Sequence, residues 1–363
     1  MLRVVRRSLA LNSMRLAPWS LIVLTLLLAG CDMGGEPGLD AGLNRDAPAR
    51  PIPLRLGLPG QPSGALLYIA LARGSFGAAG LAVEATDHPS GKRALHDGLL
   101  AGQADLISST EVPVALYGLA TLGAGSATAP RPRILASICS TDDVNRVVTR
   151  ASLGVQQPED LAGRRIATQR ASAVHFFWHL FSLEHGIHDP DGLRFMRAEE
   201  LPKALAEGEI DAFAMREPFV SQARDQIGDD LRAFAAPGLY AQRELLIVAG
   251  GFAADQPDAP RRVIRALLDA ERFAQREPAA AARLVADRLG VAPRDILALW
   301  PHSDLHVQLD QGLLLLLEEE ARWALHGRLV DGKGPAHPLP NYLDLIDSAP
   351  LETEQPSAVT LIR

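Results

Sequence analysis

Apolar residues along the chain follow two spacings, and stretches of the two kinds alternate. Short apolar runs have the length and composition of buried strands, while the stretches between them repeat apolar residues every three or four positions, as helices do. Strands are predicted at residues 53–59, 81–86, 104–108 and 131–139, and helices at residues 63–76, 90–102 and 111–123. Strands separated by helices of about ten to fifteen residues indicate βαβ units in a mostly parallel sheet.

The same alternation begins again after residue 143. Strands are predicted at residues 144–150, 164–168, 193–197 and 210–214, and helices at residues 171–186, 199–208 and 217–227. In both rounds a helix ends on glycine and an aspartate then opens an apolar strand, in "ALHDGLLAGQADLIS" and in "LPKALAEGEIDAFAM". We therefore expect two similar α/β lobes rather than one large sheet. After one more strand, at residues 244–251, the pattern is mainly helical.

The first thirty residues have a different pattern. An apolar run at residues 17–30 follows four arginines with no acid between them, and it is shorter than the roughly 20 residues of a membrane-spanning helix. This predicts a secretory signal peptide at residues 1–30, started from Met1 or Met14. Leu28-Ala29-Gly30-Cys31 resembles the bacterial lipobox, which implies a lipid on Cys31 and a membrane anchor. The alternative is an ordinary signal peptide with a chance cysteine.

Composition narrows the class of protein further. Residues 31–53 are rich in Gly, Pro, Ala and Asp without periodicity, which predicts a flexible tether. The net charge of −7 becomes about −11 when the four arginines of the signal are removed, so we expect no binding to nucleic acid. With Cys31 lipidated, Cys139 has no partner and is expected to be a buried thiol.

Candidate binding residues follow the predicted strands. Ligands of α/β sheets bind beyond the carboxyl ends of strands, where helix N-termini offer free N–H groups. Four strand-to-helix junctions qualify, at residues 59–64, 108–113, 168–173 and 215–219, although small and hydroxyl residues also simply cap helices. The candidate ligand-binding residues are Gln61, Ser63, Ser108, Ser109, Thr110, Thr168, Gln169, Ala171, Ser172, His175, Arg216 and Glu217.

Several ordered segments resemble one protein family. They are "GALLYIALARGSFGAAGLAVEATDHPSGKRALHDGLLAGQADL", "VQQPEDLAGRRIATQRASAVHFFWHLFSLEHGI", "ALAEGEIDAFAMREPFV" and "PNYLDLIDSAPL". Together they resemble the nitrate/sulfonate/taurine-type substrate-binding proteins of ABC transporters. The resemblance implies a type II periplasmic-binding-protein fold, in which two lobes close by hinge motion over a ligand in the cleft. Lobe 1 would comprise residues 54–139 and 240–330, lobe 2 residues 140–239, and a C-terminal tail on lobe 1 residues 331–363.

The resemblance also implies a function. The protein would be an extracytoplasmic lipoprotein, monomeric and without a cofactor, that delivers a small polar solute such as a sulfonate to an ABC permease and its ATPase. Asp32, directly after Cys31, resembles the inner-membrane retention signal of enteric lipoproteins. The resemblance implies a protein in the periplasm whose lipid is anchored in the inner membrane. A neutral pyrimidine-like heterocycle is the alternative ligand, and a sensor or a biosynthetic enzyme the alternative role. The chain has no G-x-S-x-G or P-loop motif, and we expect no enzyme activity.

Some side chains allow more than one interpretation. Arg216 stands where the family often has an aromatic residue, and it could bind an anion, pair with Glu217 or face solvent. His175 and His179 have the spacing of half a metal site, but packing or exposure is the simpler interpretation, and we expect no metal. The aromatic residues Phe176, Phe177, Trp178 and Phe181 are predicted to lie in the core, and the run of glutamates at residues 318–320 to form a solvated helix face.

Overall fold

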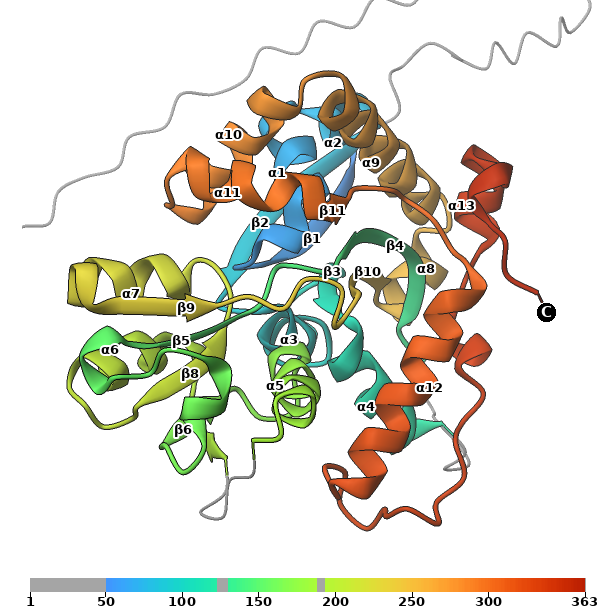
Figure 1. Ribbon diagram of the computed structural model, residues 1–363. Coiled ribbons are helices and arrows are strands. Elements are labelled where there is room, and N and C mark those ends of the chain that lie inside the picture. Colours follow the sequence, from blue (N-terminus) through green and yellow to red (C-terminus); the bar gives the residue numbers. More distant parts are fainter. Residues whose placement is uncertain (1–49, 123–129, 188–192, 363) are drawn as a thin grey trace, which may run out of the picture. The chain divides into compact units, whose positions relative to one another are not determined.

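The computed structural model describes residues 50–122, 130–187 and 193–362 of the chain (Figure 1). The predicted signal peptide, the lipidation site Cys31 and all but the last residues of the predicted tether lie outside the described residues. Among the helices within those ranges, none combines the length and the apolarity that a membrane crossing requires.

The first sheet has six strands in the order β11-β4-β10-β3-β1-β2. Strand β1 runs parallel to β2 and β3, whereas β10 runs antiparallel to both of its neighbours, β3 and β4, and β11 antiparallel to β4. The strands are β1 (Ile52–Pro59), β2 (Leu81–His88), β3 (Leu106–Thr110), β4 (Arg133–Thr141), β10 (Gln242–Val248) and β11 (Ser303–Asp304).

Helices from both ends of the described chain pack on this sheet and share its apolar core. The buried face of β1 supplies Leu54, Leu56 and Leu58, and the long helix after residue 258 supplies Val263 and Leu267. The helices are α1 (Ala65–Ala72), α2 (Ser75–Ala78), α3 (Gly91–Arg93), α4 (Glu111–Thr121), α8 (Gly250–Asp255), α9 (Ala259–Arg276), α10 (Pro278–Leu289), α11 (Pro293–Leu299), α12 (Gln311–His326) and α13 (Ala349–Glu354), with a π-helical turn at Ala94–Leu99.

The second sheet has five strands in the order β7-β6-β8-β5-β9. Its central strand β8 shows the two-residue period of a strand covered on both faces, because Ala212 and Ala214 face one core and Phe213 and Met215 the other. The elements are β5 (Arg146–Arg150), β6 (Ile166–Thr168), β7 (Arg194–Phe195), β8 (Ala212–Met215) and β9 (Leu231–Phe234), with α5 (Ala173–Glu184), α6 (Leu201–Ala206) and α7 (Phe219–Ile227).

The prediction of two α/β sheets is confirmed, but each sheet is mixed rather than mostly parallel. The antiparallel strands include β5 and β10, which the chain enters directly from the other sheet. The chain passes from β4 to β5 through residues 142–145 and from β9 to β10 through residues 235–241. The carboxyl ends of β4 and β8 lie where the chain crosses between the sheets. A strand that enters there, β10 or β5, must run away from that edge and is therefore antiparallel to its neighbours.

The predicted core residues of α5 are buried, and so is Cys139 on β4. Phe176, Phe177, Trp178 and Phe181 pack with Tyr240 and with residues of α4 in one apolar cluster. Burial raises the pKa of the Cys139 thiol well above its ordinary value, so the thiol is un-ionised at neutral pH.

Candidate functional site

The carboxyl ends of strands from both sheets carry the predicted junctions. In the first sheet Thr110 at the end of β3 pairs with Glu244 at the start of β10, and Thr141 at the end of β4 pairs with Gln242. In the second sheet the end of β8 pairs with the start of β5, because Met215 lies opposite Arg146. Residues just after these strand ends are therefore placed where a side chain from one sheet can form polar contacts with a residue of the other sheet.

A buried carboxylate organises the side of this site that belongs to the first sheet. Glu244 accepts hydrogen bonds from Ser63 Oγ (2.7 Å), Ser108 Oγ (2.7 Å) and Gln61 Nε2 (2.5 Å), and all four side chains are buried. Burial raises the pKa of Glu244, while the hydroxyl donors and the charge of Arg216 act to lower it. Three predicted residues are thus brought together around a fourth that the sequence interpretation missed.

Arg216 connects this network to the second sheet. It follows β8 directly, only 3% of its surface is exposed, and its guanidinium donates to Gln61 Oε1. The interpretation that Arg216 faces solvent is therefore wrong. Burial lowers its pKa, and the nearby Glu244 carboxylate opposes that shift. Its Nε atom is buried and has no hydrogen-bond partner, which leaves one donor unused.

Glu217 lies apart from this network. Its carboxylate accepts a hydrogen bond from the backbone N–H of Ser221 (3.0 Å) one turn further along α7, and burial raises its pKa. It lines a small cavity of about 140 Å³ together with Arg146, Arg224 and Asp295. The predicted binding role of Glu217 therefore has no support from contacts with the other candidates.

The glycine that begins α3 brings this helix close to the first sheet. Gly91 N donates to Gln61 Oε1 (3.3 Å), and a Cβ atom on Gly91 would lie 2.7 Å from the Cα atom of Ser109 and 3.2 Å from the backbone nitrogen of Thr110. Only glycine permits this approach. Ser109 donates to the carbonyl oxygen of Thr110 (3.2 Å), so its hydroxyl serves the backbone.

The junction after β6 faces the first sheet through one side chain. Gln169 Nε2 donates to Ser90 Oγ (3.4 Å), and its buried Oε1 has no hydrogen-bond partner. Thr168 and Ser172 instead bond to backbone carbonyls, of Ala214 (3.0 Å) and Gln169 (2.5 Å). At this junction Gln169 is therefore the candidate with a free hydrogen-bond acceptor, its side-chain oxygen.

Ala171 and His175 hold the start of α5. Ala171 has a left-handed backbone with φ of 54°, and its N–H donates to His175 Nδ1 (3.2 Å). This bond requires Nδ1 to be unprotonated. Burial lowers the pKa of His175 to about 4, helped by the neighbouring His179, Arg170 and Lys92. His175 is therefore neutral at physiological pH, and its ring packs edge-on against Phe195 and Trp323.

A second buried acidic group lies where the chain returns to the first sheet. The Tyr240 hydroxyl contacts Glu111 Oε1, at the start of α4, and Glu320 Oε1 (2.9 Å) on α12. Burial raises the pKa of Glu111 to about 7 and that of Glu320 well above its ordinary value, where the neighbouring Glu111 adds to the shift. The prediction that residues 318–320 form a solvated face is wrong for Glu320, which is fully buried one turn after Leu317.

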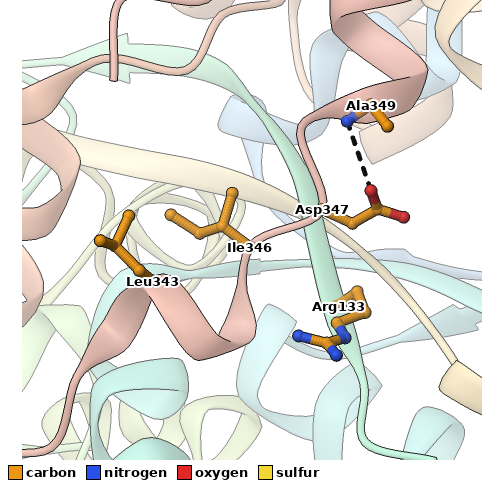
Figure 2. Close-up of a pocket in the computed structure, with 5 residues that line it drawn as sticks. All are labelled: Arg133, Leu343, Ile346, Asp347 and Ala349. Atoms are coloured by element: carbon orange, nitrogen blue, oxygen red, sulfur yellow. Dashed lines mark hydrogen bonds between the residues drawn. The ribbon is translucent and has the colours of Figure 1, made fainter. Parts of the chain in front are cut away.

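Two larger cavities lie at different distances from these groups. One of about 500 Å³ borders the junctions at Pro113 and at Arg170 and Ala171. Another of about 470 Å³ lies where the C-terminal segment crosses the start of β4, lined by Arg133, Leu343, Ile346, Asp347 and Ala349 (Figure 2). Because Arg133 begins β4 and the strand junctions lie beyond its other end, the second cavity is remote from the candidate residues. No cluster of three potential metal ligands occurs in the described ranges.

Comparison with solved structures defines the class of fold. The chain resembles the periplasmic aliphatic sulphonate binding protein SsuA of Escherichia coli, with 17% identity over 78% of this chain and 96% of that one and a TM-score of 0.62. The alkanesulfonate-binding protein SsuA of Xanthomonas axonopodis pv. citri, bound to MOPS, gives 18% identity over 83% and 100% of the two chains and a TM-score of 0.67. The fold is that of the periplasmic binding proteins.

The same fold also occurs in an enzyme. The desulfurization enzyme DSZB matches with 17% identity over 83% of this chain and 98% of that one, at a TM-score of 0.57. No curated protein matches the chain by sequence. A family model does match, over residues 61–281, and the chain belongs to the NMT1/THI5-like family.

Proposed function

We propose that the protein is the solute-binding component of an ABC importer and that it captures a small polar solute between its two sheets. The observation that supports this most directly is the buried network of Gln61, Ser63, Ser108 and Glu244, which Arg216 reaches from the second sheet. Polar groups that meet across two lobes can be exchanged for contacts to a solute, so that binding and closure are coupled.

The lobes of this proposal follow the chain crossings. Residues 54–139 and 240–330 form lobe 1 and residues 140–239 form lobe 2, with the tail of residues 331–363 on lobe 1. Ser90 with Gln169 and Arg216 with Gln61 then join the two lobes in the described conformation. Opening would break both contacts and expose the donors and acceptors to the solute.

The charges of the network bear on the chemistry of the solute. Arg216, with one unused donor, suits an oxyanion such as a sulfonate. Glu244 disfavours the binding of an oxyanion, because the buried carboxylate repels a second anion and donates no hydrogen bond to it. Glu244 therefore favours a solute that presents its own N–H or O–H donors, as a pyrimidine-like heterocycle with an amino group would. Such a heterocycle is the second candidate ligand.

A transport role is favoured over catalysis by the partners of the serine hydroxyls. Ser63 and Ser108 donate to a carboxylate that is held by three donors, rather than to a histidine that could act as a general base. His175 accepts from a backbone N–H through Nδ1 and lies against aromatic rings. We infer that the protein has no enzyme activity, needs no cofactor and acts as a monomer.

A panel of solutes tests this function. Sulfonates, taurine, nitrate, carboxylates and aminopyrimidines are added to the purified protein, and thermal stability is recorded. A ligand at one hundred times its Kd adds about 2.7 kcal/mol to the free energy of unfolding. Small-angle scattering of the stabilised complex should show contraction. Stabilisation without contraction, or the absence of any response across the panel, contradicts the proposal.

Substitutions distinguish the two ligand classes. For an oxyanion bound by Arg216, Arg216→Ala should abolish the response and Glu244→Gln should spare it. For a neutral heterocycle bound by Glu244, the two substitutions should have the opposite effects. The lipid anchor is tested apart from binding. Mass spectrometry of membrane-extracted protein should find an acylated peptide beginning at Cys31, and Cys31→Ala should release the protein from the membrane; cleaved, membrane-bound Cys31→Ala protein would disprove the anchor.

A further inference from the structure

The cavity of about 500 Å³ is lined by more basic than acidic side chains. Four of its lining side chains carry or can gain a positive charge, and one is acidic. The basic ones come from three separate parts of the chain, α3 with the turn after it, the junction after β6, and the segment after α12. They are Lys92, His96, Arg170 and Lys333, and the acid is Asp331. The remainder of the wall is mainly apolar, with Leu116 and Tyr117 of α4 among its residues.

The positive charges in this wall are only partly compensated by acids. Burial lowers the pKa of Lys92, and the positive charges of Arg170 and Arg93 lower it further. Burial also lowers the pKa of His96, with Lys92 as the next cause. Lys92 Nζ donates to the carbonyl oxygen of Arg170 (2.6 Å), a neutral acceptor that leaves the ammonium charge in place.

The cavity borders directly on the buried network. Lys92 follows Gly91, which donates to Gln61, and Arg170 follows Gln169, which donates to Ser90. Residues 90–92 and 169–171 therefore connect the buried network with the wall of the cavity, and Lys92 and Arg170 lie on the cavity side. On the inner side the buried ionisable groups are mainly carboxyl groups, those of Glu244, Glu111 and Glu320, whose pKa values burial raises. Arg216 carries the single buried guanidinium among the described residues.

We propose that the cavity binds an anionic group of the solute and that the solute is therefore bifunctional. It carries a carboxylate, sulfonate or phosphate at one end, held by Lys92, Arg170 and Lys333, and hydrogen-bond donors at the other end, directed toward the acidic interior. An apolar body between them packs against Leu116 and Tyr117. The inference rests on the proposed solute-binding function and specifies the ligand for it. A cationic wall beside an acidic interior favours one orientation of such a molecule.

Three compounds of nearly the same shape distinguish the contributions of the two ends of the solute to binding. Sulfanilate has an amine and a sulfonate, sulfanilamide has the amine and an uncharged sulfonamide, and benzenesulfonate has the sulfonate alone. We expect calorimetric titration to show that sulfanilate binds at least about tenfold more tightly than either of the others, which corresponds to about 1.4 kcal/mol. Taurine and inorganic phosphate extend the series to smaller anions.

Variants then locate the anionic group. Lys92→Gln with Lys333→Gln should weaken the binding of sulfanilate and of inorganic phosphate about tenfold or more and leave the binding of sulfanilamide unchanged. Lys203→Gln makes the same chemical change on α6, where the side chain is 72% exposed and does not line the cavity, and it should change neither. Circular dichroism confirms that each variant is folded.

The outcomes separate this inference from the proposed function. Equal affinities for sulfanilate and sulfanilamide, equal affinities of the double variant and Lys203→Gln, or no binding of any anion in the series would each overturn the inference. Lysine-dependent anion binding without contraction in small-angle scattering supports the inference and counts against solute capture. Contraction on binding a solute that is insensitive to both lysines supports solute capture and overturns the inference.

Discussion

The paired carboxyl groups of Glu111 and Glu320 make the stability of the protein depend on pH in a direction that can be measured. Both are fully buried and both contact the Tyr240 hydroxyl. Glu111→Gln is the informative change, because the amide has nearly the same shape, its oxygen can still accept from Tyr240, and it cannot ionise. The replacement removes one titrating group from the pair.

The magnitude follows from the pKa of Glu111, which burial raises from 4.5 to about 7. A carboxyl whose pKa is raised on folding stabilises the fold below its unfolded pKa, and this contribution is lost as the pH rises through the folded value. The difference of about 2.5 pH units corresponds to about 3 kcal/mol, at about 1.4 kcal/mol per unit. The wild type therefore loses stability of this order between about pH 4.5 and pH 8 as the pair of carboxyl groups loses its first proton.

Urea unfolding at a series of pH values measures this effect. Relative to the wild type, Glu111→Gln should gain up to about 3 kcal/mol in unfolding free energy between about pH 5 and about pH 8. Tyr240→Phe is the control, since it keeps both carboxyl groups and removes their shared donor. It should destabilise the protein by about 1–3 kcal/mol, the cost of leaving a buried acceptor unpaired. Identical pH dependences for the wild type and Glu111→Gln would refute the reasoning.

Three further outcomes follow from other contacts. Gly91→Ala should destabilise the protein by about 1–3 kcal/mol in urea unfolding, because its Cβ would lie 2.7 Å from the Cα atom of Ser109; Gly77→Ala, where a Cβ meets no atom within 4 Å, is the matched control. His175→Phe should remove up to about 3 kcal/mol of acid destabilisation, since the pKa of His175 falls from 6.5 to about 4 and stability is lost as the pH drops through that range; an unchanged acid limb of the stability curve would contradict this. Cys139 should react with a thiol reagent only in denaturant, and rapid labelling of the native protein would show that its burial is wrong.

Much of the fold could be read from periodicity because helices and strands bury faces with different repeats. The two rounds of strand and helix, the apolar face of α5 and the burial of Cys139 all have local signals. The antiparallel direction of β5 and β10 has none, since it depends on which edge the chain crosses. A strand's own residues are compatible with either direction.

The site was only partly predictable. Gln61, Ser63 and Arg216 follow strands, Ser108 lies near the end of one, and all four were found by position. Glu244 lies near the start of β10, 136 residues after Ser108, and contacts it only through the fold. A charged residue in the otherwise apolar "ELLIV" was a usable signal. Glu320 also had one, because it follows Leu313 and Leu317 by seven and three positions and therefore shares their helix face.

The placement of β10 has a consequence for how the chain acquires its structure. β3 and β4 are not neighbours in the first sheet, and each pairs instead with β10, which comes after all five strands of the second sheet. A chain emerging from its N-terminus can complete the second sheet from residues 146–234 alone. The first sheet must wait with a gap between β3 and β4 until residues 242–248 arrive. A chain that ends before residue 242 has all the strands of the second sheet, but in the first sheet it can pair only β1, β2 and β3, and it leaves β4 without a neighbouring strand.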